Sequence, residues 1–115
     1  MKMIIAVIQP SKYQTLRDAL NRIAVSRLTI CDAMGIGQQL GEVEPSDGQE
    51  TSTLLRPKIV LEIVVNDDFV ERTIETIVSI AKTGSQGQVN DGKIFVVPVG
   101  ESIRISDLSR GAGAV

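Results

Sequence analysis

Three short segments of this chain are apolar at almost every position, which leaves few folds open to it. They span residues 3–8, 59–65 and 94–99 and are rich in isoleucine and valine. Short apolar runs of this composition predict buried β-strands. A sheet with one face in water would alternate apolar and polar residues. We therefore expect both faces of this sheet to be covered.

The interval after the first strand predicts a helix and a further strand. Pro10 ends the first strand, and Ser11 with Gln14 resembles a capping box at the start of a helix. Apolar residues then recur with helical spacing at Tyr13, Leu16, Leu20 and Ile23. A weaker strand is expected after this helix, over residues 27–33, and it fades through residues 34–37.

The interval after the strand at 59–65 predicts a second helix. Asn66, Asp67 and Asp68 supply cap residues and early-turn carboxylates. Lys82 and Gly84 are stop signals. One apolar face is expected from Val70, Ile74, Ile77, Val78 and Ala81.

The resulting order, βαββαβ, is typical of an α+β, ferredoxin-like fold with an antiparallel sheet and two helices on one face. Residues 93–99 form the fourth strand, residues 103–105 are expected to add a short edge strand, and residues 111–115 a loose tail. At 115 residues, the whole chain (1–115) is expected to be one domain. Two helices can cover only one face of the sheet. Because the second face is also apolar, we expect another copy of the chain to cover it, in a homo-oligomer whose sheets face inward.

Residues 38–52 form a polar stretch with almost no apolar side chain. Nothing in it could pack a core, so it predicts a long mobile loop. Both an interaction loop and a passive linker fit this composition. Its acidic residues favour a partner with basic side chains; they are Glu42, Glu44, Asp47 and Glu50.

Residues 83–93, here called the phosphate-side loop, combine three glycines, small polar residues and one lysine. Consecutive backbone N–H groups beside a lysine can hold a phosphate. The spacing Gly87-x-x-x-x-Gly92-Lys93 is similar to a Walker A loop, but Ile94 stands where that motif has Ser or Thr, and the segment runs from helix into strand. It therefore predicts a phosphate grip of another type, and a plain surface turn stays open.

Composition excludes several classes of function. The chain has no histidine, which removes Ser-His-Asp and Cys-His catalysis and makes a transition-metal site unexpected. Its net charge of −2 and three aromatic residues do not suit nucleic acid. A single cysteine, no membrane-length apolar run and no signal-peptide pattern predict a cytoplasmic protein that is not membrane-embedded.

Taken together, the motifs resemble the P-II signalling family of nitrogen-regulatory proteins and their P-II-like relatives. The register matches without a gap from residue 1 to Gly84, and the resemblance covers essentially the whole chain. The matching pieces are Met1-Lys2-Met3-Ile4, Gln9-Pro10, Gly35-Ile36-Gly37 with Gln39, Arg56-Pro57-Lys58-Ile59, Thr83-Gly84 and Asp91-Gly92-Lys93-Ile94-Phe95-Val96.

Membership would imply a homotrimer with adenine nucleotide, ATP or ADP, in clefts between subunits. It would also imply a long loop, here residues 37–55, that reaches a regulated transporter or metabolic enzyme. By this resemblance Gln39 is a magnesium ligand, and Gln39 with Lys58 holds 2-oxoglutarate. The implied nucleotide-binding positions are Thr29, Gly35, Gly37, Gln38, Gln39, Val64, Gly87, Asp91, Gly92, Lys93 and Arg104.

The chain also departs from the family pattern. Gln38 and Ser106 stand where phosphate-contacting arginines are usual, and three extra residues lie between Gly84 and Asp91. A hydrogen bond to a charged group contributes about 1.5–3 kcal/mol, so each loss would weaken triphosphate binding roughly 10–100-fold. AMP or cyclic AMP become candidates beside ADP. Thr51 and Gln49 replace the family's modified tyrosine and serine, so neither modification is expected.

Several functions stay open at this point. The first is a non-enzymatic sensor in nitrogen metabolism. The second is a P-II-like sensor of inorganic carbon, in which Lys58 pairs with bicarbonate. A slow nucleotide hydrolase would have to use Glu62 or Asp91 as its base, and a purely structural oligomerisation module would bind no ligand.

Overall fold

A computed structural model describes residues 1–38 and 53–115, with the side chains of 37, 38, 53 and 54 left out. The observed order is βαββαβ, as the sequence predicts. Single 3₁₀ turns precede both helices and β4 and lie near the C-terminus. The elements are β1 (Lys2–Ile8), α1 (Tyr13–Arg22), β2 (Thr29–Gln38), β3 (Thr53–Val65), α2 (Val70–Ala81) and β4 (Gly92–Pro98).

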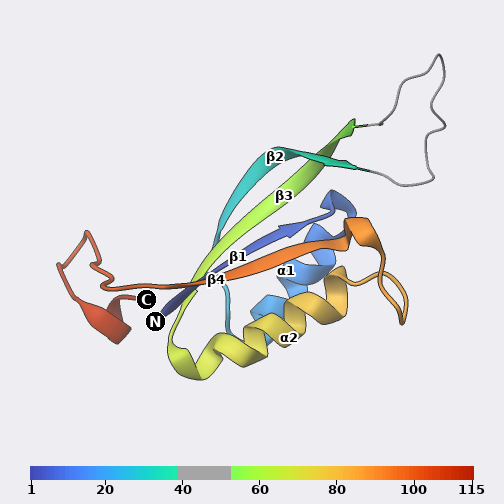
Figure 1. Cartoon of the computed structure of the whole chain (residues 1–115). Coiled ribbons are helices and arrows are strands. Elements are labelled where there is room, and N and C mark those ends of the chain that lie inside the picture. The colour runs from blue at the N-terminus through green and yellow to red at the C-terminus, as the bar shows by residue number, and fades with distance from the viewer. Residues whose placement is uncertain (39–52) are drawn as a thin grey trace, which may run out of the picture.

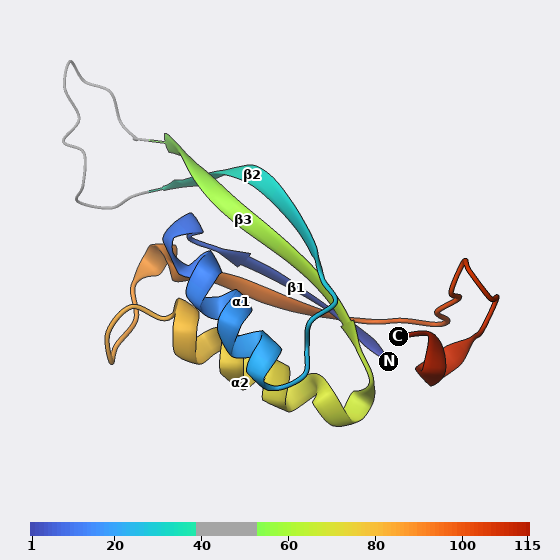
Figure 2. The same ribbon diagram turned by 180° about the vertical axis from the view of Figure 1, so that it is seen from behind.

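The four strands form one antiparallel sheet in the order β2-β3-β1-β4. Both helices lie on the same face of the sheet (Figures 1 and 2). This arrangement confirms the predicted ferredoxin-like α+β fold. Neither helix in the described part of the chain is long and apolar enough to cross a membrane.

Strand alternation explains where the core sits. Side chains at even positions of β1 and odd positions of β3 point toward the helices. Ile4 and Ile63, which are partners in the β1–β3 register, are both fully buried. From the helices, the core takes Leu16 and Leu20 of α1 and Ile77 of α2. The remaining core residues are Ala6, Ile8, Val25, Leu61, Val65 and Ala81.

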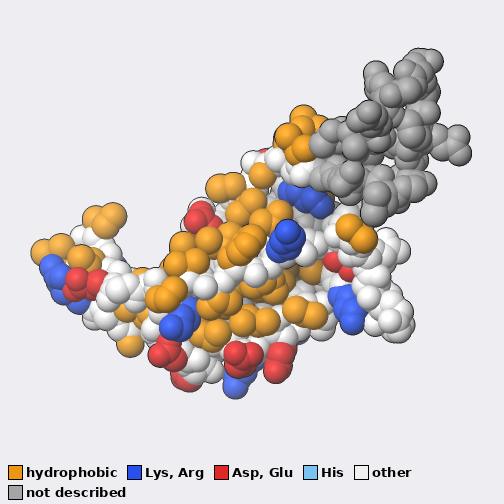
Figure 3. Space-filling model, in the orientation of Figure 1, with side chains coloured by type: hydrophobic (Ala, Val, Ile, Leu, Met, Phe, Trp, Pro, Cys, Tyr) orange, Lys and Arg blue, Asp and Glu red, His pale blue; other side chains and the backbone are white. Residues whose placement is uncertain are grey.

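The other side of the sheet, here called the open face, is covered by neither of the two described helices. By alternation its apolar members are Met3, Ile5, Val7, Val60, Val64, Phe95 and Val97. Phe95 is 51% exposed and Val97 39% exposed. Figure 3 shows hydrophobic side chains gathered in a band over the strands. The chain therefore fills one face of its sheet and leaves the other apolar and uncovered.

Two strands are longer than the sequence predicts. β2 continues to Gln38, and β3 already begins at Thr53. Their pairing runs from Thr29 opposite Glu62 to Gln38 opposite Thr53. The predicted loop bounds of 37–55 were therefore too wide, because cross-strand hydrogen bonding extends the hairpin through glycine-containing and polar positions. The rest of that loop, with Gln39, Gln49 and Thr51, lies outside the described residues.

The helix ends also differ from the prediction. No side chain caps either helix, so the predicted capping box at Ser11 is wrong. Pro10–Lys12 instead form a 3₁₀ turn that leads into α1. On α2 the predicted inward residue Val78 is 45% exposed, and Thr73 is buried in the helix. Thr73 is tolerated there because its hydroxyl donates to the carbonyl of Phe69 at 2.7 Å.

The C-terminal segment, residues 99–115, is folded back on itself. Ile103 makes only an isolated bridge with Arg110, so the predicted edge strand at 103–105 is wrong. Residues 111–114 form a 3₁₀ turn, and the Gly111 amide donates to the Ser102 carbonyl at 3.0 Å. The predicted loose tail is therefore wrong as well, since backbone hydrogen bonds hold it.

Candidate functional site

The phosphate-side loop is closed by the carboxylate of Asp91. One oxygen accepts from the Thr83 hydroxyl at 2.5 Å, and the other accepts from the Thr83 amide at 3.0 Å and the Gln88 amide at 2.7 Å. Asp91 thus joins the end of α2 to the start of β4. All three of these hydrogen bonds come from the loop's own donors, which indicates a role in holding the loop.

These hydrogen bonds also fix the charge of Asp91. The Thr83 hydroxyl, then the Thr83 and Gln88 amides, lower the pKa of Asp91 below its usual value. A carboxylate with a lowered pKa is a poor general base near neutral pH. The open hydrolase alternative is left with Glu62, which lies on the open face opposite Ile5 and Thr29.

Gly92 allows β4 to begin where it does. It adopts a φ of +122°, and a Cβ at this position would lie 1.8 Å from the carbonyl oxygen of Val7. Only glycine permits this close approach of the two backbones. Gly92 therefore places the phosphate-side loop directly beside the end of β1.

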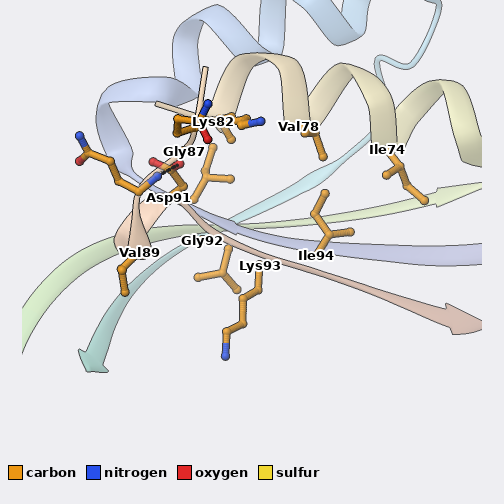
Figure 4. Close-up of a pocket in the computed structure, with 14 residues that line it drawn as sticks. Ile74, Val78, Lys82, Gly87, Val89, Asp91, Gly92, Lys93 and Ile94 are labelled. Atoms are coloured by element: carbon orange, nitrogen blue, oxygen red, sulfur yellow. Dashed lines mark hydrogen bonds between the residues drawn. The ribbon is translucent and has the colours of Figure 1, made fainter. Parts of the chain in front are cut away.

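A hollow of about 720 Å³ lies between the end of α2 and the start of β4, and four predicted nucleotide-binding residues line it: Gly87, Asp91, Gly92 and Lys93. Figure 4 shows Ile74, Val78 and Lys82 on the helix side, and Asp91 turned toward Gly87. Lys93 points away from α2, to the opposite side of β4. The lysine therefore faces the open side of the sheet.

A second hollow of about 490 Å³ brings Val64 and Arg104 together. Arg104 donates to the Gly113 carbonyl at 2.8 Å and lies 3.3 Å from the Asp107 carboxylate. The Ser109 amide is the largest cause that lowers the pKa of Asp107. The folded C-terminal segment thus holds the Arg104 guanidinium through its two terminal nitrogens.

The predicted β2 residues fall into place by register. Thr29 pairs with Glu62, so it is the diagonal neighbour of Val64 on the open face. Gly35 pairs with Arg56, which lies two residues before Lys58 on the same face of β3. Gly37 and Gln38 are the last two residues of β2. Gln39, predicted as metal and effector ligand, lies outside the described residues.

Lys58 makes a contact that the sequence did not predict. Its ammonium donates to the carbonyl of Asn90 at 3.1 Å, and the side-chain amide of Gln9 donates to the same oxygen at 3.2 Å. Sequence reasoning missed Asn90 and Thr83 as functional positions. The only available signal was their place inside a glycine-rich segment, which does not show which group closes the loop.

The predicted site residues therefore form two groups at opposite ends of the sheet. Gly92 pairs with Ile8 at one end of β1, and Val64 pairs with Met3 at the other. The phosphate-side loop and the C-terminal segment lie at these two ends in both views (Figures 1 and 2). Lys93 and Arg104 do not meet within one chain.

Among the described residues, no three His, Cys, Asp or Glu side chains cluster closely enough to hold a metal ion. Cys31 is a free, exposed thiol on β2. The described cations near the two hollows are Lys82 and Lys93 at one end and Arg27 and Arg104 at the other. Each hollow therefore has two cations beside it, and the first is otherwise lined mainly by apolar side chains and the Asp91 carboxylate.

Comparison with known proteins agrees with the resemblance read from the motifs. A family model described as "Nitrogen regulatory protein P-II" matches residues 1–108. The chain belongs to the P-II family.

Curated relatives align over all or most of its length. The "Nitrogen regulatory protein GlnK1" of Methanosarcina mazei is 44% identical over 115 residues, which is all of this chain and 97% of the relative. The "Nitrogen regulatory protein P-II" of Azospirillum brasilense is 39% identical over 115 residues, all of both chains. The "Nitrogen regulatory protein P-II 1" of Escherichia coli is 40% identical over 105 residues, 91% of each chain. These names describe P-II proteins as regulators.

Proposed function

We propose that this P-II protein is a homotrimeric sensor that binds adenine nucleotide between adjacent copies and regulates a transporter or metabolic enzyme of nitrogen metabolism through the long loop between β2 and β3. The observation that carries the proposal is the division of the predicted ligand residues between two ends of the sheet. A site assembled from two copies can unite Lys93 of one chain with Arg104 of the next. A site within one chain cannot.

The open face supports assembly of this kind. Its apolar side chains form a broad exposed surface, and such a surface marks an interaction site. Three inward-facing sheets would bury Phe95 and Val97 and place the ends of neighbouring sheets side by side. The phosphate-side loop of one copy and the C-terminal segment of another would then line a common cleft.

In this proposal Lys93, the amides of the phosphate-side loop and Arg104 hold the phosphates, while Thr29 and Val64 adjoin the adenine. Gly35 and Gly37 form the base of the long loop. Gln39 and Lys58 take an anionic effector such as 2-oxoglutarate, with Mg²⁺ at Gln39. Binding of nucleotide and effector would shift the population of long-loop conformations, and this shift would change the affinity of the loop for the partner.

The first test is the oligomeric state and nucleotide binding. Light scattering should give three times the 12.4 kDa mass of one chain. In calorimetry, Lys93→Ala and Arg104→Ala should each weaken nucleotide binding roughly 10–100-fold, since each removes a charged hydrogen-bond donor. Arg110→Ala is the matched control, because Arg110 lies in the same segment as Arg104 and its guanidinium is bonded to Glu101. A monomer, or a trimer that binds no adenine nucleotide at millimolar concentration, contradicts the proposal.

A mixing experiment tests whether the site is shared. Lys93→Ala chains and Arg104→Ala chains are unfolded together, refolded and titrated with ADP. On the order of a quarter of the interfaces between copies should then contain both wild-type residues and bind normally. If the mixture binds no better than either variant alone, the two residues act within one chain and the shared site is wrong.

A second candidate function is favoured by Gln38, Ser106 and the longer phosphate-side loop. With fewer cations for a triphosphate, a P-II-like sensor linked to inorganic carbon would bind ADP, AMP or cyclic AMP and use Lys58 for bicarbonate. A thermal-shift panel separates the two. Stabilisation by ATP with 2-oxoglutarate supports the nitrogen sensor, and stabilisation by AMP or cyclic AMP with bicarbonate supports the carbon sensor.

A further inference from the structure

Lys58 stands where three parts of the molecule meet. It lies on β3, its ammonium donates to the carbonyl of Asn90 in the phosphate-side loop, and Gln9 at the end of β1 donates to the same carbonyl. Both hydrogen bonds are partly buried. Asn90 immediately precedes Asp91, the residue that closes the loop. The Asn90 carbonyl is therefore a second point, beside Asp91, at which the phosphate-side loop is held.

The aliphatic stem of Lys58 lies against the backbone of β2. A Cβ at Gly35 would come within 3.0 Å of the Lys58 Cγ and 3.3 Å of its Cε. Because Gly35 has no side chain, the stem can pass over this strand. β2 and β3 are the strands that lead into and out of residues 39–52. One side chain thus contacts both the phosphate-side loop and the base of the hairpin that carries the long loop.

We propose that Lys58 is a positioning residue that holds the phosphate-side loop through the Asn90 carbonyl and couples that loop to the β2–β3 hairpin. This role is distinct from direct contact with an effector. Its consequence for nucleotide binding rests on the proposed function, but the positioning itself does not. A movement of the loop that keeps the bond to Asn90 must also shift the Lys58 stem over Gly35.

The chemistry explains why a lysine suits this place. An ammonium makes a stronger hydrogen bond to a carbonyl than a neutral donor does. The Asn90 carbonyl has two lone pairs, and Lys58 with Gln9 supplies a donor for each. Loss of Lys58 leaves a partly buried carbonyl with a single donor, and loss of both leaves it with neither from these side chains.

Hydrogen exchange of the ligand-free protein tests the positioning directly. In Lys58→Met, the hydrogen-bonded amides of Gln88 and Asp91 should exchange about tenfold faster, at the lower end of the effect expected for a charged hydrogen bond. Lys58→Arg keeps a charged donor and should restore most of the protection. Arg17→Met, the matched control, removes one positive charge from the exposed side of α1 and should leave these amides unchanged. Unchanged exchange in Lys58→Met overturns the proposal.

A second variant keeps the test decisive if Lys58→Met destabilises the whole sheet. Gln9→Leu removes the neutral donor to the same carbonyl and should accelerate exchange of the Gln88 and Asp91 amides by a smaller factor. The double variant should differ from the product of the two single effects, because both donors act on one oxygen. Multiplicative effects would show independent roles and overturn the proposal.

Nucleotide titration then separates this inference from the proposed function. If the wild-type protein binds nucleotide, Lys58→Met should weaken binding about tenfold without added effector, and Gly35→Ala should weaken it as well by displacing the stem. If Lys58→Met loosens the loop but leaves nucleotide affinity unchanged, the proposed consequence for nucleotide binding is overturned. If loop exchange responds as expected while the wild-type protein binds no nucleotide, the positioning stands and the proposed function fails.

Discussion

The two faces of the sheet contrast within the same strands. On the helix side, Ile4, Leu61 and Ile63 have no exposed surface. On the open face, Phe95 and Val97 keep 51% and 39% of theirs. Both sets are apolar, so composition does not distinguish them. The difference is that α1 and α2 cover one face and no described element covers the other, which teaches that side-chain type alone does not decide burial.

The largest expected effect is that of Gly92→Ala, which disturbs the pairing of β4 with β1, on which both faces of the sheet depend. The added Cβ would overlap the Val7 carbonyl, which lies 1.8 Å away. Either β4 separates from β1 or the chain does not fold, at a cost of more than about 4 kcal/mol. Urea unfolding measures the lost free energy if the variant folds, and a variant that does not fold shows no unfolding transition. Gly100→Ala is the control, since a Cβ there meets nothing within 4 Å.

Next comes Ile63→Ala, on the covered face. Removing a fully buried side chain should lower the free energy of unfolding by about 2–5 kcal/mol, because lost burial and the cavity left behind add together. Urea titration followed by circular dichroism measures it. A loss below 1 kcal/mol would mean that this face is less tightly packed than the burial indicates.

A smaller effect, about 1–2 kcal/mol near neutral pH, is expected for Asp91→Asn, which weakens the hydrogen bonds that close the phosphate-side loop. The pKa of Asp91 is lowered in the folded protein. Its contribution is therefore complete above the ordinary aspartate pKa of 3.8 and is lost as pH falls through the lower folded value.

Unfolding of the wild-type protein and of Asp91→Asn is compared over this pH range. The difference between them should shrink below about pH 4. Asp68→Asn is the control, an exposed carboxylate for which the described residues show no hydrogen bond. A difference that stays constant down to pH 2 would show that Asp91 does not act through its charge.

Phe95→Ser should have the smallest effect on the fold of the single chain and sharpens the comparison most. Replacing a half-exposed residue of the open face removes apolar surface that only a second copy would cover. Light scattering should show a shift toward single chains with the far-ultraviolet circular dichroism spectrum retained. Val89→Ser changes a 97% exposed residue outside the open face and should leave the mass unchanged. An unchanged mass for Phe95→Ser would locate the contact between copies elsewhere.

Much of the fold followed from local patterns. The strand at 59–65 and both helices were predictable because apolar periodicity reports burial directly. The extension of β2 through Gly35 and Gly37 was not, since pairing with β3 decides it and no local preference does. Likewise Ile103 and Ile105 read as a strand, but Ile103 pairs only with Arg110 of its own segment, in an isolated bridge.

The candidate site divides in the same way. Its residue types, glycines with Lys93 and a distant Arg104, were visible in the sequence because anion binding needs amides and cations wherever they come from. Asp91 was predicted as a ligand contact, and its hydrogen bonds to Thr83 and Gln88 became visible only in three dimensions. A carboxylate near a glycine-rich loop can hold either a ligand or the loop, and only the donors around it distinguish the two.

The sequence by itself determined the element order, the apolar character of both sheet faces and the glycines and cations on which the proposed anion site rests, since these depend on side-chain type and spacing. The tertiary structure alone decided which face the helices cover, that Lys93 and Arg104 lie at opposite ends of the sheet, and that Lys58 reaches the Asn90 carbonyl. Those facts arise from packing and strand register between residues far apart in the chain, and no local pattern carries that information.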